Sequence, residues 1–413
     1  MQSRFFYGWV IVMVAFVVDF IAVGFFFYSY GVFFLPIANE LGGGSRFGVS
    51  MGIALVNGVS AIIAPWVGNA LDRYPIKRIM AFGACVSALG FATLSFVRNM
   101  TEFYIALISL TAIGTATMGQ LATGKLVANW FSVKRGTALG IATMGVSLSG
   151  VIMPPVTTWL IIEFGWRGSL EIFSITTLVI VLPVVLLFVV NTPEEKGLEP
   201  DGKTPLPLAV GTKPNVEVKI NWRDVLRNRA FWGVTLTFGL LFCCMGATLT
   251  NLIPLARDLG FDRYQAAYAL TAGAFTGVIG KIFFGILSDR ANARLAVVFV
   301  IITQWLGIAL IVYSKSYLVL VIASAIFGFG MGGVAPLHAM MVGTLFGRRE
   351  FGKVMGLMRP MMLPLQTIGL PLSGFIYDRV GNYDLAFDLF LVLLVIAILT
   401  TVFIIPKERP ASL

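Results

Sequence analysis

The sequence predicts an all-α membrane protein with twelve transmembrane helices in two six-helix bundles. Hydrophobic residues make up 58% of the 413 residues and charged residues only 12%, whereas a soluble protein carries about 25% charged residues. Apolar runs long enough to span a bilayer as helices recur along the whole chain. A single polar segment divides these runs into two groups of six.

Polar turns, many with Gly or Pro, separate the apolar runs and set approximate bounds for the helices. The first run is too long for a cleavable signal peptide and has no small-residue cleavage site after it, so we expect it to remain. The predicted spans are 8–30, 48–70, 79–97, 103–125, 139–162, 168–190, 230–253, 265–287, 294–313, 317–341, 354–376 and 384–405.

The polar segment 191–229 is rich in Pro, Glu, Lys and Gly. It predicts a cytoplasmic linker between an N-terminal bundle, 1–190, and a C-terminal bundle, 230–413. Because the linker divides the chain nearly in half, the two bundles suggest a duplication.

The positive residues behind the net charge of +10 are distributed as in a membrane protein. Most of the 30 lysines and arginines fall in loops on one side if the N-terminus is cytoplasmic, which is the positive-inside pattern. We therefore expect an inner-membrane protein with both termini in the cytoplasm and no nucleic-acid partner. Cys85, Cys243 and Cys244 all lie inside apolar runs, which favours neither a disulfide nor a metal site. We expect no metal and no cofactor, and nothing demands more than a monomer.

One short motif, G-x-x-x-D-R with a cation downstream, occurs at equivalent places in both halves. Its residues are Gly68, Asp72 and Arg73 after the second span, and Gly285, Asp289 and Arg290 after the eighth. The glycine lets neighbouring helices approach closely, and the carboxylate can pair with a cation or face the positive N-terminus of another helix. We predict that both loops act in gating.

The repeated loop resembles the signature loop of the major facilitator superfamily. Further segments resemble its monocarboxylate transporter and oxalate/formate antiporter branch: Tyr7-Gly8-Trp9, Asn129-Trp130-Phe131, Gly165-Trp166-Arg167 and Tyr377-Asp378-Arg379. The resemblance implies two six-helix bundles around a central cavity that opens alternately to the two sides of the membrane.

Two cations lie deep inside predicted spans. Lys281 lies eight residues before Asp289, about 12 Å into the hydrocarbon, and Arg359 lies seven residues after Gly352, about 10 Å inward. A cation there costs about 2.5–3.5 kcal/mol by insertion scales, so it normally faces a cavity, a partner or a ligand. We predict that both bind an anionic substrate, since Arg can hold a carboxylate through two parallel hydrogen bonds. The alternatives are that Lys281 snorkels to the interface and that Arg359 bonds carbonyls freed by Pro360.

The resemblance to oxalate/formate antiporters implies a substrate cation in each of the eighth and eleventh helices. Met331 and Ala335 stand in the tenth helix where those antiporters carry large aromatic residues. We therefore expect a larger or more apolar carboxylate than oxalate.

Asp19 lies ten residues past Trp9, about 15 Å into the membrane and close to its midplane. Burial favours the neutral form of a carboxyl group, so Asp19 is a candidate proton carrier. The alternative is a protonated aspartate that hydrogen-bonds a neighbouring helix.

Four further polar residues are predicted to contact the substrate: Tyr28, Gln120, Asn251 and His338. Gln120 and Asn251 are equally suited to helix–helix contacts. His338, the only histidine, is otherwise a structural residue or a proton relay. Lys125 lies five residues before Trp130, about 8 Å inward, and is expected to snorkel or to join a cytoplasmic gate.

These residues predict a secondary active transporter of mono- or dicarboxylates, working by anion exchange or proton symport. Its expected partners are a small organic anion, the lipid bilayer and protons. A drug or cation exporter that uses Asp19 as its acidic anchor is the alternative of the same fold. A membrane-embedded enzyme or a non-transporting sensor is the alternative of another class. No paired intramembrane aspartates or Ser/His dyad occur in the sequence, so we expect no enzyme.

Overall fold

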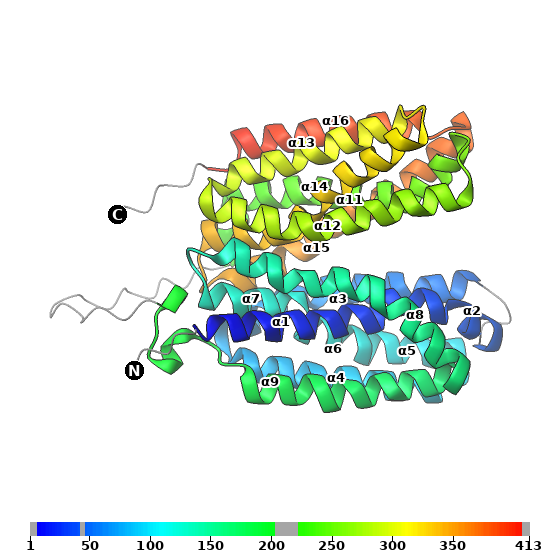
Figure 1. Cartoon of the computed structure of the whole chain (residues 1–413). Helices are drawn as coiled ribbons and strands as arrows, with labels where there is room; N and C mark the ends of the chain where they lie inside the picture. The colour runs from blue at the N-terminus through cyan, green and yellow to red at the C-terminus, as the bar shows by residue number, and fades with distance from the viewer. Residues whose placement is uncertain (1–5, 42–45, 203–221, 407–413) are drawn as a thin grey trace. The chain divides into compact units, whose positions relative to one another are not determined.

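The computed structural model describes residues 6–41, 46–202 and 222–406. Within these ranges all regular structure is helical (Figure 1), which confirms the predicted all-α class. Ten stretches of the described chain are long and apolar enough to cross a membrane. One of them, Arg135–Phe188, is divided into two helices at Gly165, whose φ of 69° is not helical. With the 30-residue helix Phe351–Val380, these stretches make up the twelve predicted spans.

The chain divides by its internal contacts into two compact units. Unit 1 comprises residues 1–132, 142–219 and 348–360, and unit 2 comprises residues 133–141, 220–347 and 361–413. Each unit therefore contains one short segment from the other half of the sequence. These segments are the first turns of two long helices.

Unit 1 is built from the helices of the first half of the sequence. They are α1 (Gly8–Val23), η1 (Gly24–Tyr28), α2 (Ser29–Leu41), α3 (Arg46–Arg73), α4 (Ile76–Phe96), α5 (Met100–Ala106), η2 (Leu107–Thr111), α6 (Ala112–Met118), α7 (Gln120–Trp130), α8 (Arg135–Thr176), η3 (Thr177–Val181), α9 (Leu182–Phe188), η4 (Pro193–Lys196) and η5 (Pro200–Gly202).

The first helical stretch is longer than predicted. Instead of ending near residue 30, it continues through the π-helical turn η1 into α2 and ends at Leu41. The Ser29 hydroxyl donates a hydrogen bond of 2.9 Å to the Gly24 carbonyl and also contacts the Thr157 hydroxyl at 2.7 Å. These bonds satisfy polar groups at the widened turn, so the helix continues without a break.

The Gly165-Trp166-Arg167 segment fixes the turn within α8. The Trp166 indole donates to Glu40 at 2.6 Å, and Arg167 pairs with the same carboxylate at 2.8 Å. Arg167 also donates to the carbonyls of Ser95 and Val97 at 2.6 and 2.7 Å. One guanidinium therefore ties the ends of α2 and α4 to this turn.

Unit 2 is built from α10 (Trp222–Arg227), α11 (Arg229–Asp258), α12 (Arg263–Arg290), α13 (Ala293–Val312), α14 (Tyr317–Phe346), α15 (Phe351–Val380) and α16 (Asp384–Phe403). Helices α12 and α13 both pack against α14 (Figure 1). A Cβ atom added to Gly328 would lie 1.9 Å from the Gly273 carbonyl oxygen. Backbone contact between α12 and α14 therefore depends on these small residues, as is common between membrane helices.

Candidate functional site

A cavity of about 310 Å³ lies in unit 1, which is within the usual size range of small-molecule sites. Its walls come from α1, η1, α3, α6, α7, α8 and the first part of α15. The polar residues of the lining are Tyr28, Asn57, Ser60, Thr115, Gln120 and Arg359, and the remainder is apolar or glycine. Arg359 is the only ionic side chain in this lining, and it is exposed.

The cavity brings together three of the predicted substrate-binding residues, Tyr28, Gln120 and Arg359. Tyr28 packs closely on α8, because a Cβ added to Gly150 would lie 2.8 Å from the Tyr28 ring. Asn57 and Ser60 of α3 belong to the same lining but were not among the predicted site residues. Their three-residue spacing places them on one face of the helix, which was the available signal.

Two irregular turns shape this cavity. The π-helical turn η1 carries Phe26, Phe27 and Tyr28, all of which line it. The second turn is at Gly119, whose extended backbone ends α6 and begins α7. The N-terminus of α7 consequently lies in the cavity wall at Gln120, and a helix N-terminus favours negative charge. The sequence did not predict this break.

Asp19 is buried in α1, with 1% of its surface exposed. The Thr123 hydroxyl of α7, also buried, lies 3.0 and 3.1 Å from the two carboxylate oxygens. Asp19 thus contacts a neighbouring helix. Both interpretations, a proton carrier and a structural aspartate bonded to a neighbouring helix, are compatible with this contact. Arg359 and Asp19 interact electrostatically. Sequence reasoning missed Thr123.

Three of the predicted substrate-binding residues belong to unit 2. Lys281 in α12 is buried, with 8% of its surface exposed. Asn251 in α11 donates to the Ala247 carbonyl of its own helix at 2.9 Å and to the Ser373 hydroxyl of α15 at 2.8 Å, and the second bond is a helix–helix contact. His338 in α14 is buried and packs on the ring of Phe238, with 4.8 Å between ring centroids.

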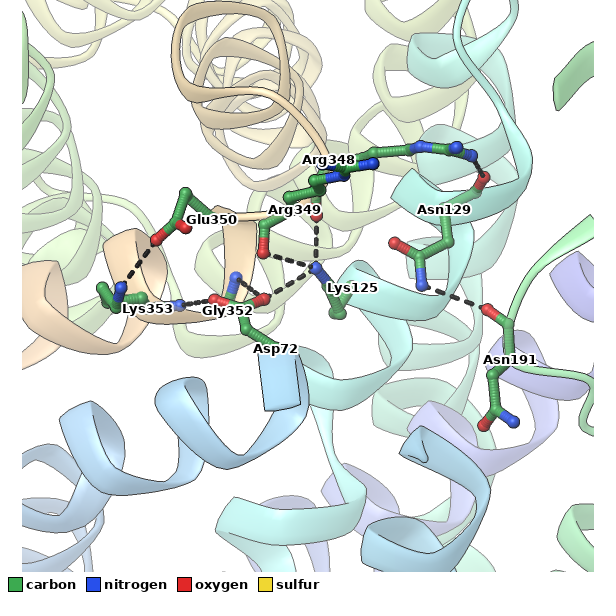
Figure 2. A network of polar contacts seen from close by, with 9 residues as sticks. All are labelled: Asp72, Lys125, Asn129, Asn191, Arg348, Arg349, Glu350, Gly352 and Lys353. Carbon is green, nitrogen blue, oxygen red and sulfur yellow. Dashed lines mark hydrogen bonds and ion pairs between the residues drawn. The ribbon is translucent and has the colours of Figure 1, made fainter. Parts of the chain in front are cut away.

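Asp72, at the end of α3, holds the first turn of α15 in unit 1 (Figure 2). Its two carboxylate oxygens accept hydrogen bonds from the backbone N–H groups of Gly352 at 3.0 Å and Lys353 at 2.6 Å. A carboxylate at this position satisfies free amide donors and complements the positive end of the helix.

Lys125 joins the same network instead of reaching the surface. Its ammonium group lies 2.6 Å from Asp72, and the lysine is 4% exposed. It also donates to the carbonyls of Arg348 and Arg349 (Figure 2). Three acceptors therefore surround the three N–H donors of this buried lysine.

Arg348 connects the network to the start of the linker. Its guanidinium pairs with Glu194 and donates to the Asn129 carbonyl at 3.4 Å. The Asn129 side chain in turn donates to the Asn191 carbonyl at 3.0 Å (Figure 2). Burial raises the pKa of Glu194, but hydrogen bonds from Arg348, the Glu194 backbone and Thr192, together with the charge of Arg348, outweigh burial, so that pKa lies below its usual value.

Asp289 repeats the Asp72 arrangement within unit 2. Its carboxylate accepts hydrogen bonds from the backbone N–H groups of Gly136 at 2.6 Å and Thr137 at 2.7 Å, in the first turn of α8. The motif arginines Arg73 and Arg290 are exposed. The two motif aspartates thus perform the same local task, each holding a helix N-terminus.

The motif glycines contact these same helix starts. A Cβ on Gly68 would lie 1.9 Å from the Gly352 carbonyl oxygen, and one on Gly285 would lie 2.5 Å from that of Gly136. Further into each helix, Gly356 contacts the Ala64 carbonyl and Gly140 contacts the Lys281 carbonyl. The partner helices therefore share a second repeat that the sequence analysis missed, G-x-x-x-G at 136–140 and 352–356.

Comparisons with known proteins agree with this arrangement. The Major Facilitator Superfamily matches residues 12–358 and 251–413. Monocarboxylate transporter 13 of Bos taurus is 27% identical over 387 residues, covering 92% of this chain and 85% of the relative. Monocarboxylate transporter 11 of Homo sapiens is 26% identical over 391 residues, covering 92% and 79%.

The fold has a solved counterpart. The human organic anion transporter MFSD10 superposes with a TM-score of 0.70 at 15% identity, covering 95% of this chain and 99% of that one. The fold, the repeated loops and these matches define a multi-pass membrane transporter. The chain belongs to the Major Facilitator Superfamily, as its motifs predicted.

Proposed function

We propose that this protein is a secondary active transporter of small organic anions, mono- or dicarboxylates, that works by alternating access. The observation that carries the proposal is Arg359, a cation exposed in a cavity whose other polar groups are uncharged. Its guanidinium can hold a carboxylate through two parallel hydrogen bonds. Tyr28 and Gln120 supply further hydrogen bonds, and Phe26 and Phe27 offer an apolar surface.

The electrostatics of the cavity wall support an anion over a cation. A charged side chain inside a membrane costs at least about 2.5 kcal/mol, and a bound carboxylate offsets this cost at Arg359. The N-terminus of α7 at Gln120 adds positive potential to the same wall. A cation or drug exporter would need an accessible acid, whereas Asp19 is buried against Thr123.

Lys281 is proposed as a second anion-binding cation, supported by the internal repeat. It precedes Gly285 by four residues, as Ala64 precedes Gly68, and each contacts a glycine of the G-x-x-x-G repeat. Because Ala64 lines the cavity of unit 1, we propose that Lys281, at the equivalent position of the repeat, faces the substrate.

The remaining assignments extend this mechanism. Asp72 and Asp289 hold helix starts in one state of the transport cycle and release them in the other. Asn251 and His338 stay proposed substrate contacts, and Asp19 is the proposed site of proton coupling if transport is symport. We further propose bundles 1–190 and 230–413, an inner-membrane location, cytoplasmic termini and a monomer.

The relatives' names support the substrate class, since those of cow and human are called monocarboxylate transporters. The test is counterflow in proteoliposomes with labelled mono- and dicarboxylates, with and without a pH gradient. Lys281→Ala and Arg359→Ala should lose uptake while remaining folded. The exposed cations Lys315 and Arg98 provide matched controls as Lys315→Ala and Arg98→Ala. Normal uptake by both site variants would reject the proposed anion site.

A further inference from the structure

Thr123 and Asp19 form a buried pair one helical turn from the cavity. Asp19 precedes the lining residues Ala22 and Val23 by three and four positions on α1, so it shares their face. Thr123 follows the lining residue Gln120 by three positions on α7. With exposed fractions of 1% and 2%, both side chains are shielded from water. The carboxyl group therefore depends on protein partners in place of water.

The Thr123 hydroxyl has a second acceptor within reach. Besides the Asp19 oxygens at 3.0 and 3.1 Å, it lies 3.4 Å from the Gly119 carbonyl oxygen. A hydroxyl group carries one donor and two acceptor positions and can rotate. When Asp19 is ionised, the hydroxyl donates to the carboxylate. When Asp19 is protonated, the hydroxyl can accept the carboxyl proton's hydrogen bond and donate to Gly119.

We propose that Thr123 is a positioning residue that sets the pH at which Asp19 takes up its proton, which rests on the proposed role of Asp19 in proton coupling. The proton comes from water and ends on a carboxylate oxygen of Asp19. No proton leaves Thr123, whose hydroxyl only changes its acceptor. A hydrogen bond donated to a carboxylate favours the charged form, so Thr123 lowers the pH at which the carboxylate becomes protonated.

Ionisable groups occur on some of the elements around Asp19. Arg359 of α15 acts on it electrostatically, and Lys125, two residues past Thr123 on α7, is paired with Asp72. Tyr28 follows on the same helical stretch in η1. The segments α6, α9 and η3, which pack against α1, contain no ionisable residue.

Helix α8 also packs on α1, because a Cβ on Gly145 would meet Phe16. In unit 1 its ionisable residues are Glu163, Arg167 and Glu171, the first of them 18 positions after Gly145. Glu163 therefore lies about 27 Å along the helix from that contact, at about 1.5 Å per residue, and Arg167 and Glu171 follow the turn at Gly165. Removing the Thr123 hydroxyl therefore changes the surroundings of Asp19 without changing a charge.

The test is an infrared pH titration of the Asp19 carboxyl band in the purified full-length protein, with the band assigned by Asp19→Asn. Thr123→Val removes the hydroxyl and keeps the shape, and Thr123→Ser keeps the hydroxyl. Thr177→Val is the matched control, since Thr177 is also fully buried in unit 1 and its hydroxyl donates to the Phe173 carbonyl at 2.8 Å.

The midpoint for Thr123→Val should rise by about one to two pH units, and Thr123→Ser and Thr177→Val should stay near the wild-type value. An unchanged midpoint in Thr123→Val, an equal rise in Thr177→Val, or a wild-type band that does not titrate would overturn the inference. This readout needs no substrate. If the titration shifts as expected but vesicles show carboxylate uptake that does not depend on pH, the proposed proton coupling fails and the positioning role stands; if vesicles show no carboxylate uptake at all, the proposed function fails and the positioning role still stands.

Discussion

Gly68 lies so close to Gly352 that a Cβ atom added to Gly68 would be 1.9 Å from the Gly352 carbonyl oxygen. The clash is with backbone, which cannot rotate away as a flexible side chain can. The contact places the carboxylate of Asp72, one turn further along α3, on the amide groups of Gly352 and Lys353. The glycine of the motif thus positions its aspartate.

Gly68→Ala should therefore slow transport by separating α3 from the start of α15. We expect initial uptake rates to fall at least about tenfold, because the carboxylate loses charge-assisted bonds worth about 1.5–3 kcal/mol each. Gly58→Ala is the control on the same helix, since a Cβ at Gly58 meets nothing within 4 Å. Equal uptake by both alanine variants would contradict this role for Gly68.

Asp72→Asn should destabilise the folded protein, because it leaves the ammonium group of Lys125 buried without its carboxylate partner. Breaking a buried ion pair on one side costs about 3–5 kcal/mol. We expect a clear fall in the thermal unfolding temperature, measured in detergent. The double variant Asp72→Asn with Lys125→Met should recover part of it. If the double variant loses as much stability as the two single variants lose together, the two residues are not coupled.

The pairing of Glu194 with Arg348 should stabilise the linker's start at neutral pH and less so in acid. The pKa of Glu194 lies below its usual value in the folded protein. The ion pair therefore contributes fully to the stability at pH values above the pKa that Glu194 has in the unfolded chain. It is lost as pH falls through the folded pKa. The difference in unfolding temperature between wild type and Glu194→Gln should shrink from neutral pH to about pH 4.

Glu199→Gln, in the same segment of the linker, is the control for that titration. It should unfold like the wild type across the same pH range. A stability difference between wild type and Glu194→Gln that does not depend on pH would contradict the ionic origin of the effect.

Gly150→Ala should impair substrate binding indirectly, by displacing the ring of Tyr28. The added Cβ would lie 2.8 Å from that ring, and the ring moves more easily than a helix. We expect the KM for the transported carboxylate to rise about threefold to tenfold, the loss of one hydrogen bond of about 1 kcal/mol. Tyr28→Phe should give a similar rise. Gly31→Ala, whose Cβ meets nothing within 4 Å, should leave the KM unchanged.

The fold followed from hydrophobicity because each span must bury a long apolar stretch in the bilayer. Local breaks were harder to predict. The π-helical turn at Gly24–Tyr28 and the extended residue Gly119 interrupt apolar sequence that contains no proline. Such turns depend on side-chain bonds from elsewhere, like the one between Ser29 and Thr157, which the local sequence does not reveal.

The candidate site was predictable in its charges and less so in its partners. Arg359 was predicted from its membrane depth, Gln120 from its polarity and Tyr28 from the resemblance to the superfamily, and the cavity contains all three. The sequence predicted that Asp72 could face the N-terminus of another helix, but it did not say which helix. The residue at that N-terminus, Gly352, is 280 positions away, and the G-x-x-x-G repeat at 352–356 that marks it was missed in the sequence. Thr123 gave no sequence signal beyond a hydroxyl group in an apolar helix.

The central claim is that a carboxylate binds the guanidinium of Arg359, and equilibrium binding to purified protein tests it most directly. A thermal-shift screen of mono- and dicarboxylates selects a ligand that stabilises the wild type, and calorimetry then gives its Kd for each variant. Arg359→Ala should weaken binding by at least about 30-fold. Arg359→Lys should weaken it less, because charge remains but the paired hydrogen bonds are lost. A carboxylate that binds Arg359→Ala as tightly as the wild type would contradict the account.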